Sequence, residues 1–557
     1  MAGKSDFGSE GVEIPGIVAR ILAARGMASS EMGAFLYPDY ARDLADPFLM
    51  TDMSVAVERI LQAARAEERV VVYGDYDIDG ITASAVLMEA LRALGLEVSS
   101  YIPDRFEEGY GINAAALERL QAEGAQLVIS VDCGITSVDE AAWAREHGLD
   151  LIITDHHAVA EQIPEALAVI NPKRPGDAYP CKDLAGVGVA FALVRGLQAA
   201  DGRPEPGQEK WMLDLVAMGT ICDVVPLVGE NRVLASFGLK VLRRTRRVGL
   251  RALAAMGGVN IAGISAHDVG FVLGPRMNAA GRLEHAARSL ELVMTADMGR
   301  AEEIAGELEE LNRQRRADQA AIFAEADKLA EARAEDAVLV LADAGWSHGV
   351  VGIVASKLAE KWGRPVLLAQ VLGASVKGSA RSVPGFNMVE ALRSQQHLLD
   401  RFGGHFFAAG YTLAAGSVDE LRTGLNEYYR HTMSEEPNEA VTAPVEIEWR
   451  GLDEVDLELL GVLELLEPHG NANPEPVVGV AGLEVLAARG VGSGGKHLSM
   501  RLRDQGGKVL GAIGFGLAER YASTKPGQSV AVRGHLNKNE FQGKISVQMV
   551  LSELSHE

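Results

Sequence analysis

Cysteine is nearly absent from this chain, since the 557 residues include only Cys133, Cys181 and Cys222. An odd, sparse count argues against a disulfide framework and indicates a reducing compartment. The spacing does not resemble a zinc site, and we expect small buried side chains. Long apolar runs are also missing: none approaches the roughly 20 residues of a membrane span, and the first residues lack the apolar core of a signal peptide. We therefore expect a cytoplasmic protein with no membrane contact.

Positive charge is also in short supply, with 53 basic against 77 acidic residues and a formal net charge of −24. This balance argues against a protein that coats nucleic acid nonspecifically, because such binding depends on neutralising many phosphates. It leaves room for a local basic groove. The arginine-rich run at 243–251 could form part of one, or could equally be a solvated loop.

Strands and helices alternate from about residue 69 to 225. Apolar strand patterns cover 70–73, 97–102, 127–131 and 151–154, and amphipathic helical patterns cover 82–94, 114–123 and 137–146. This alternation predicts an α/β, doubly wound and mostly parallel sheet. Ligands of such sheets bind beyond the carboxyl ends of the strands.

The rest of the chain divides by composition. Residues 1–60 read as an N-terminal helical segment, and 61–296 hold the first α/β domain with a largely helical second half. Residues 297–335 contain no proline and predict one connecting helix of about 55 Å. A second, smaller α/β domain is expected at 336–432. Short strands between glycine-rich turns predict a β-barrel of the OB type at 441–557.

Carboxylates gather at the predicted strand ends. Asp75, Asp77 and Asp79 alternate directly after the first strand, Asp132 follows a later strand, and another strand ends on Asp155-His156-His157. Neighbouring carboxylates repel one another unless a cation lies between them. Carboxylates with imidazole and no thiolate suit Mn²⁺ or Mg²⁺. With Asp223 added, the ligands exceed the needs of one ion and fit a two-metal site.

Three segments resemble known ligand-binding motifs but lack residues that those motifs require. An EF-hand loop opening at Asp75 requires glutamate at its twelfth position, which here is Val86. The run 490–496 resembles a P-loop, but His497 replaces the required hydroxyl residue, so we predict a hairpin turn. Gly186 and Gly188 precede a helical pattern and predict a tightly packed helix start.

Two further segments have the composition of phosphate grips. Residues 274–282 combine Arg276 and Arg282 with Asn278, and arginine suits bidentate contacts with phosphate. In the second α/β domain, hydroxyl, guanidinium and imidazole groups lie among small residues, at Ser379, Arg381, Gly404 and His405. Taken singly, each could be a surface ion pair or a tight loop. Together they predict a domain that holds a phosphate-bearing substrate against the metals.

In this order, the motifs resemble the DHH phosphoesterase family and, within it, the RecJ-type single-strand-specific exonucleases. The segments that carry the resemblance are 74–80 (GDYDIDG), 131–135 (VDCGI), 155–157 (DHH), 223–227 (DVVPL), 274–282 (GPRMNAAGR), 349–356 (GVVGIVAS), 378–382 (GSARS), 403–405 (GGH), 468–470 (PHG) and 473–476 (NPEP). Family members often have Trp-His-x-Gly-Val before the glycines of the second domain. Here the order is Trp346-Ser347-His348-Gly349, so no role is assigned to His348.

The resemblance implies a DHH catalytic domain, a DHH-associated substrate-binding domain and an OB-type barrel. It implies that the catalytic residues are Asp132, His156, His157 and Asp223, and that the metal ligands are Asp75, Asp77, Asp79, Asp132, His156 and Asp223, with Asp132 as the bridge. His157 would face the scissile phosphate. The residues implied to hold nucleotide phosphates are Arg276, Asn278, Arg282, Ser379, Arg381, Gly404 and His405.

The same resemblance implies an exonuclease that degrades single-stranded DNA 5′→3′ to 5′-mononucleotides in recombination and repair. It implies two Mn²⁺ or Mg²⁺ ions, and a monomer that works with a single-strand-binding protein and a helicase. The nearest alternatives are a DHH-type oligoribonuclease and a cyclic-dinucleotide phosphodiesterase. An inorganic pyrophosphatase would have no use for a barrel. A non-catalytic scaffold is disfavoured because every candidate ligand is still Asp or His.

Overall fold

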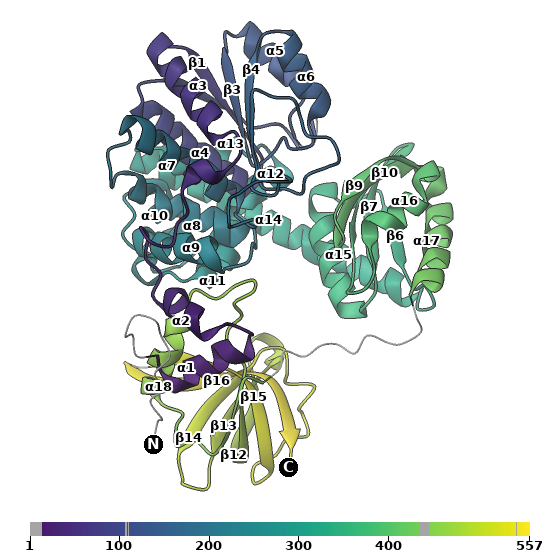
Figure 1. The fold of residues 1–557 in the computed structure, drawn as a ribbon. Helices are drawn as coiled ribbons and strands as arrows, with labels where there is room; N and C mark the ends of the chain where they lie inside the picture. The colour runs from purple at the N-terminus through teal and green to yellow at the C-terminus, as the bar shows by residue number, and fades with distance from the viewer. Residues whose placement is uncertain (1–13, 106–107, 110, 434–444, 542) are drawn as a thin grey trace.

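The computed structural model describes residues 14–105, 108–109, 111–433, 445–541 and 543–557. It consists of two α/β lobes joined by one long helix, with a β-barrel below the first lobe (Figure 1). We call these parts the first lobe, built on β1–β5, the second lobe, built on β6–β10, and the barrel. Within the described residues, no helix is both long and apolar enough to cross a membrane.

The first lobe contains the predicted doubly wound sheet. Its strands are parallel and lie in the order β2-β1-β3-β4-β5. Their bounds are β1 Arg69–Gly74, β2 Glu97–Tyr101, β3 Leu127–Val131, β4 Asp150–Thr154 and β5 Ala168–Ile170. Sequence reasoning missed β5, because three residues are too few to show a period. From β1 the chain adds β2 on one side and β3, β4 and β5 on the other, so the strand order reverses between β1 and β3. The carboxyl ends of these two strands form the switch point at which such sheets bind ligands.

Alternate residues of β1 bury on opposite faces of the sheet. Val70 and Val72 belong to the core beneath α4 and α7, whereas Val71 and Tyr73 belong to the core beneath α5 and α6. This period of two makes the sheet doubly wound. The helices of the lobe are α3 Met53–Ala66, α4 Ile78–Ala93, α5 Ala114–Ala122, α6 Val138–Glu146, α7 Gly186–Asp201, α8 Leu213–Cys222, α9 Gly229–Leu242, α10 Val248–Met256, α11 Ala266–Asp268, α12 Gly274–Leu283 and α13 Ala287–Met294.

The connecting helix α14 covers Met298–Glu331, 34 residues or about 51 Å. Its first half contributes Ile304 and Leu308 to the core of the first lobe. Its second half contributes Ile322 and Ala326 to a core of the second lobe. The helix is therefore packed at both ends and carries the second lobe at a fixed distance from the first.

The second lobe is a mixed sheet in the order β6-β7-β8-β10-β9, with only the β6–β7 pair parallel. Helix α15 starts beside the first lobe: a Cβ on Gly349 would lie 2.1 Å from the carbonyl oxygen of Arg282 at the end of α12. The elements are β6 Leu339–Asp343, α15 His348–Trp362, β7 Val366–Leu372, β8 Ser375–Arg381, α16 Met388–Ser394, β9 Leu399–Gly404, β10 Ala408–Ala414 and α17 Val418–Thr432.

The barrel confirms the OB-type prediction. Five strands close on themselves through the β12–β15 pairing, and β14 runs parallel to β16. Its elements are β11 Ile447–Arg450, α18 Leu457–Leu463, β12 Val478–Val491, β13 His497–Arg503, β14 Val509–Gly514, β15 Ser529–Phe541 and β16 Lys544–His556. The P-loop-like run is the predicted hairpin turn, since Gly490 pairs with Leu498 across β12 and β13.

The N-terminal helices are divided between two cores. Helices α1 (Gly16–Ala24) and α2 (Ser29–Leu36) pack into the core of the barrel, although they lie at the opposite end of the chain. Helix α3 packs under the first sheet. The described part of the predicted segment 1–60 is therefore not one packing unit. Residues 1–13 lie outside the described residues, and the other predicted domain boundaries remain predictions.

A buried arginine fixes the barrel to the first lobe. Arg232 on α9 is 2% exposed, and its guanidinium stacks 3.7 Å from the ring of Phe35 on α2. It donates hydrogen bonds to five backbone carbonyl oxygens, those of Phe35, Leu465, Leu466, Glu467 and Pro468. Burial and the charge of Arg25 lower the pKa of Arg232 to about 10, so it is a cation at neutral pH. This contact joins three segments that are distant in sequence.

We expect Arg232→Ala to lower the free energy of unfolding by about 3 kcal/mol or more, because it leaves several buried carbonyl groups without donors. Denaturant unfolding measures this loss. Arg313→Ala is the matched control, since the Arg313 side chain on α14 is 74% exposed and pairs only with Glu310. A change within about 0.5 kcal/mol is expected there. Equal effects of the two substitutions would contradict a joint at Arg232.

Candidate active site

Four segments of the first lobe bring carboxylates and imidazoles together at the switch point of the sheet. Three overlapping groups have ligand atoms within 4.8 Å of one another: Asp75 with Asp77 and Asp132, Asp79 with His156 and Asp223, and Asp132 with His156 and His157. All six predicted metal ligands belong to these groups. Nε2 of His156 lies 3.1 Å from Oδ1 of Asp132 and 3.6 Å from Oδ2 of Asp223.

Several of these buried atoms make no hydrogen bond to any residue that the structure describes. They include Oδ1 of Asp75, Oδ1 of Asp132 and Nε2 of His156. The last two are 3.1 Å apart, but their geometry is not that of a hydrogen bond. Atoms that face one another in this way, without a proton between them, are arranged as two ligands of a common ion. Carboxylate oxygen and imidazole nitrogen are donors that Mn²⁺ and Mg²⁺ accept, so the residues fit the predicted metals.

Electrostatics supports the same conclusion. Burial, followed by the charges of Asp79, Asp77, Asp75 and Asp223, raises the pKa of Asp132 well above its usual range. Burial and neighbouring carboxylates also raise the pKa of Asp223 to about 9 and that of Asp79 to about 7. Burial, with the charge of His157, lowers the pKa of His156 to about 3. The carboxylates therefore ionise together only when cations compensate them.

Backbone groups hold the acidic loop in place. The carboxylate of Asp77 caps α4 by accepting from the amides of Asp79 and Gly80, at 2.9 and 3.2 Å. The carboxylate of Asp79 accepts from the amides of Gly186 and Val187 at the start of α7, at 2.6 and 2.9 Å. Helix N-termini stabilise negative charge, so the starts of α4 and α7 both lower the free energy of holding these carboxylates ionised.

Gly186 is essential to this arrangement. A Cβ at this position would lie 2.4 Å from Oδ1 of Asp132. Asp132 itself has φ = 60°, a left-handed conformation that is uncommon for residues other than glycine. The predicted tight packing at the start of α7 is confirmed, and the group packed against Gly186 is Asp132, a candidate metal ligand.

Sequence reasoning grouped Asp155 with the potential metal ligands, but the structure gives it another use. Its Oδ1 accepts from the amides of His156 and His157 and lies 2.8 Å from Nδ1 of His157, and its Oδ2 accepts from the amide of Ile135. Burial acts to lower the pKa of His157, but the hydrogen bond and charge of Asp155 outweigh it and raise the pKa to about 9. Asp155 is a positioning residue that orients the His157 ring.

The segment 274–282 serves two purposes. Asn278 accepts a hydrogen bond from the amide of Ile78 at 2.9 Å, so it supports the acidic loop. Arg276 is bound to Glu309 on α14 at 2.5 Å and to the carbonyl oxygen of Val272, which fastens α12 to α14. This use of Arg276 differs from the predicted phosphate contact. Arg282 has no carboxylate partner among the described residues and is the member of the segment that remains available for an anion.

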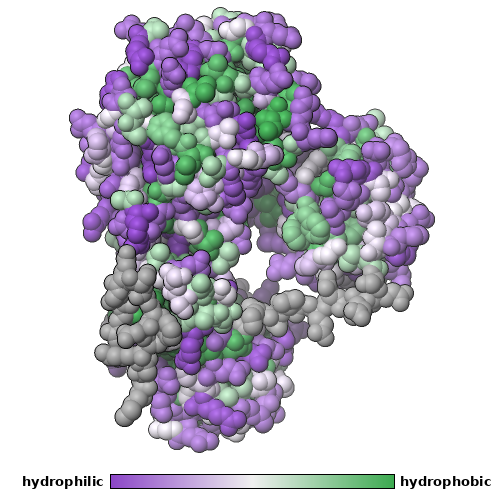
Figure 2. Space-filling model, viewed as in Figure 1, coloured by the Kyte–Doolittle hydropathy of each residue, from purple (hydrophilic) through white to green (hydrophobic). Residues whose placement is uncertain are grey.

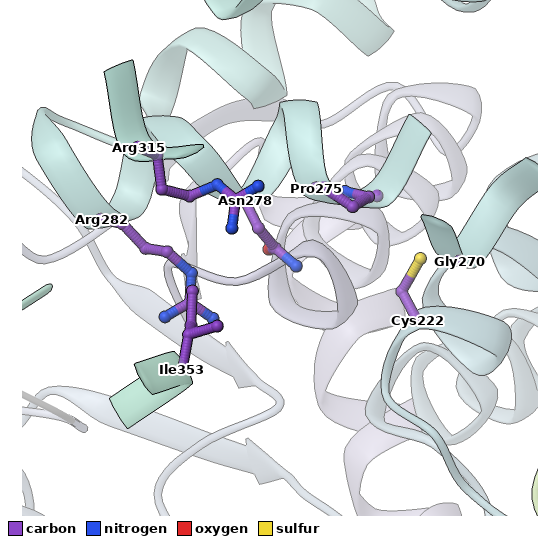
Figure 3. A pocket seen from close by; sticks show the side chains of 8 residues that line it. Cys222, Gly270, Pro275, Asn278, Arg282, Arg315 and Ile353 are labelled. Atoms are coloured by element: carbon purple, nitrogen blue, oxygen red, sulfur yellow. The ribbon is translucent and has the colours of Figure 1, made fainter. Parts of the chain in front are cut away.

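Arg282 lies on a small cavity of about 130 Å³ between the lobes. Figure 3 shows Arg282, Arg315 and Asn278 on one side of this cavity and Cys222 across from them. Burial, then the charges of Arg105 and Arg315, lowers the pKa of Arg282 to about 10. Arg315 was missed by sequence reasoning because it lies in a helix full of arginine and glutamate.

The predicted phosphate-binding residues Ser379, Arg381 and His405 lie in the second lobe, on β8 and just after β9. Oγ of Ser379 and Oγ of Ser356 accept from the Arg381 guanidinium at 2.8 and 3.0 Å, which fixes its direction. Burial and the charges of His157 and Lys173, which both belong to the first lobe, lower the pKa of His405. At Gly404 a Cβ would lie 2.3 Å from the carbonyl oxygen of Ala408, so this glycine closes the turn.

Arg105 is a further candidate for binding substrate phosphates, and no sequence motif pointed to it. It follows β2 in a loop, and its guanidinium lies 4.9 Å from the ring centroid of Tyr76 in the acidic loop. After burial, its charge is the largest cause that lowers the pKa of Arg282, Arg381 and Lys377. Arg105 therefore lies between the acidic loop and the cations of the second lobe.

The arginine-rich run at 243–251 is not a free basic groove. Arg247 is bound to Glu89 and Asp214, Arg246 stacks 3.8 Å from the ring of Trp211, and Arg243 donates to the carbonyl oxygen of Ile264. These side chains hold helices of the first lobe together.

This fold and site define the class of protein. The family model described as DHH family, N-terminal domain, matches residues 69–220. The DHHA1 domain model matches residues 335–431, and the RecJ OB domain model matches residues 450–553. The three matches correspond to the first lobe, the second lobe and the barrel.

Comparison with individual proteins narrows the class further. The chain is 40% identical to the single-stranded-DNA-specific exonuclease RecJ of Bacillus subtilis, over 98% of this chain and 68% of that protein. It is 36% identical to the RecJ of Dickeya dadantii, over 97% of this chain and 96% of that protein. A crystal structure of RecJ from Thermus thermophilus in complex with Mn²⁺ matches with a TM-score of 0.82 and 32% identity, over 97% of this chain and 76% of that chain. The chain belongs to the RecJ family.

We expect Asp132→Asn to stabilise the metal-free protein by about 1–3 kcal/mol, because it removes one charge from a crowded buried cluster. Asparagine also tolerates the left-handed backbone of this position. A raised pKa means that the folded state holds protons that the unfolded state has lost, so stability falls as pH rises. The advantage of the variant should therefore be larger at about pH 8 than at about pH 6.

Thermal unfolding with and without Mn²⁺ measures this effect. The same substitution should greatly reduce the rise in Tm that Mn²⁺ gives the unmodified protein, because a shared ligand is lost. A metal-free variant that is less stable than the unmodified chain would contradict charge repulsion at Asp132.

Gly186→Ala should displace Asp132 without changing any ligand, and we expect activity to fall on the order of 100-fold. The control is Gly306→Ala on α14, where a Cβ would meet nothing within 4 Å. That substitution should raise stability by about 0.5–1 kcal/mol and leave activity unchanged. Metal-dependent hydrolysis at the same rate in both variants would rule out the close approach as a constraint.

Proposed function

We propose that this protein hydrolyses single-stranded DNA from one end, as a metal-dependent exonuclease. The observation that carries the proposal is the cluster of Asp75, Asp77, Asp79, Asp132, His156 and Asp223 at the sheet edge, with unpaired buried ligand atoms, facing a basic surface of a second lobe. Its family relatives are named single-stranded-DNA-specific exonucleases, and two related crystal structures contain manganese.

Two divalent cations held by these six residues would supply an activated water and neutralise charge on the scissile phosphate. Asp132 belongs to two of the three ligand groups, which supports its role as the bridging carboxylate. His157, oriented by Asp155, presents its imidazole beside the cluster as a cation or hydrogen-bond donor toward the phosphate. Each of these roles rests on the chain's own geometry.

The strand passes between the two lobes. Arg105, Arg282, Lys377, Arg381 and Arg401 come from both lobes and form no ion pair with a carboxylate among the described residues. In a chain of net charge −24, cations left without carboxylate partners and brought close together are arranged for an anion. Figure 2 shows the surface hollowed between these lobes. Arg282, Ser379, Arg381 and His405 hold the phosphates nearest the metals.

The barrel guides the strand toward the metals. OB-type barrels bind single strands through stacking and backbone contacts. Here the barrel is held rigidly by Arg232 and by Asn471, whose side chain donates to the carbonyl oxygen of Val224 beside Asp223. The distance between guide and metal centre is therefore fixed by packing.

Direction, product and partners extend the proposal. The chain degrades DNA 5′→3′ to 5′-mononucleotides, acts as a monomer in the cytoplasm, and works with a single-strand-binding protein and a helicase in recombination and repair. Family membership supports these points. The alternative functions, an oligoribonuclease or a cyclic-dinucleotide phosphodiesterase, are disfavoured because the barrel and the basic surface suit a long strand.

Digestion of end-labelled single strands with Mn²⁺, and with a chelator as control, tests the proposal. We expect mononucleotides from the 5′ end first, no reaction with chelator, and a loss of about 100-fold or more in Asp132→Ala. Gly306→Ala serves as the active control. Asp132→Ala that hydrolyses normally with Mn²⁺ present would falsify the two-metal assignment. Dinucleotides cleaved faster than a long strand would favour the alternative enzymes, and release from the 3′ end would reverse the direction.

A further inference from the structure

Two adjacent phenylalanines are exposed on the turn between β9 and β10. Phe406 is 39% exposed and Phe407 is 56% exposed. Their ring centroids lie 4.8 Å apart at an interplanar angle of 64°. Only 5% of the residues of this chain are aromatic. An exposed pair of large apolar side chains is a feature that folding does not require, because burying either ring would be more favourable.

The backbone of this turn is rigid. The carbonyl oxygen of Phe407 accepts from the amide of Ser382 at 2.8 Å, and that of Phe406 accepts from the amide of Met388 at 2.9 Å. The amide of His405 donates to the carbonyl oxygen of Ala408 at 2.8 Å. The rings are therefore presented from a fixed position and not from a loose loop.

That position is next to the phosphate-facing residues. Arg381 is the register partner of Ala408, and Ser379 is the partner of Gly410. Phe407 thus lies one residue along the chain from the register partner of Arg381, and the pair directly follows His405.

We propose that Phe406 and Phe407 form a stacking platform for an unpaired nucleobase of the strand. The inference rests on the proposed exonuclease function and names a further contact of the same site. Ser379 and Arg381 hold a phosphate, and the base attached to a neighbouring sugar stacks on the exposed ring faces. Aromatic rings accept any base in this way, so the contact is tolerant of sequence.

The platform also contributes to the choice of single strands. A base in a duplex is stacked on its neighbours and paired along its edge, so it presents no free face to a protein ring. A base from a single strand can stack at once. The cations of the two lobes bind phosphates of either form, whereas the phenylalanine pair selects the unpaired one.

A double-mutant cycle, in which one change is made in the protein and the other in the DNA substrate, tests this contact. We compare the unmodified chain with Phe406→Ala/Phe407→Ala on single strands that carry one abasic position, moved nucleotide by nucleotide. In the unmodified protein, kcat/KM should fall about 5- to 150-fold when the abasic position reaches the platform. In the double variant, the intact strand should show this loss and the abasic position should cause no further one.

Controls separate stacking from folding. Phe271→Ala removes a ring that is 73% exposed on the first lobe, and it should leave the abasic profile unchanged. Phe406→Leu/Phe407→Leu retains apolar volume, so it should fold and unfold as the unmodified chain does while losing most of the abasic response. Phosphate contacts do not depend on the base, so cleavage of a strand that is abasic at the platform should be the same in all variants.

Two outcomes overturn the inference: an abasic profile in the double variant that equals that of the unmodified chain, and an unmodified chain with no sensitive position. The first outcome would also be expected if the pair bound a protein partner instead of DNA. Failure of the proposed function looks different, because the unmodified chain would then release no nucleotides from any single strand.

Discussion

Repulsion among buried carboxylates is the constraint on which the rest of this structure depends. Asp75, Asp79 and Asp132 are nearly inaccessible to water, and each raises the free energy of ionising the others. The surrounding fold is built to hold them together despite this cost. The start of α7 supplies amides to Asp79, Gly186 leaves room for Asp132, and Asp155 directs His157 toward the cluster. Bound cations would offset this repulsion.

Rigid connections bring substrate-facing groups to that site. Helix α14 is buried in both α/β lobes, and Arg232 fastens the barrel through five carbonyl oxygens. Cations from two lobes, with Arg105 between them, therefore remain close together although their charges repel. The carboxylates that repel one another therefore lie next to cations that also repel one another. Metal ions bound to the carboxylates and phosphates bound to the cations would relieve both.

Much of the fold and the centre of the site could be predicted from the chain. The alternation of strand and helix patterns predicted the parallel sheet, a long stretch without proline predicted the connecting helix, and short strands between glycine-rich turns predicted the barrel. Ligands after strands were expected at one edge because parallel strands end together. The short strand β5 was not predicted, since three residues show no period. Helices were expected in residues 1–60, but the packing of α1 and α2 on the barrel was not, because an amphipathic helix does not reveal which core it joins.

Local sequence determined which side chains gather at the candidate metal site: Asp75, Asp132, His156 and Asp223 each follow an element whose end is fixed by its own pattern. Tertiary structure alone decided how the arginines are used. Arg276 pairs with Glu309, Arg232 binds carbonyl oxygens, and Arg105 faces the acidic loop. The physical reason is reach. A carboxylate at a strand end is placed by its backbone, whereas a long guanidinium side chain finds its partner among groups that only folding brings near.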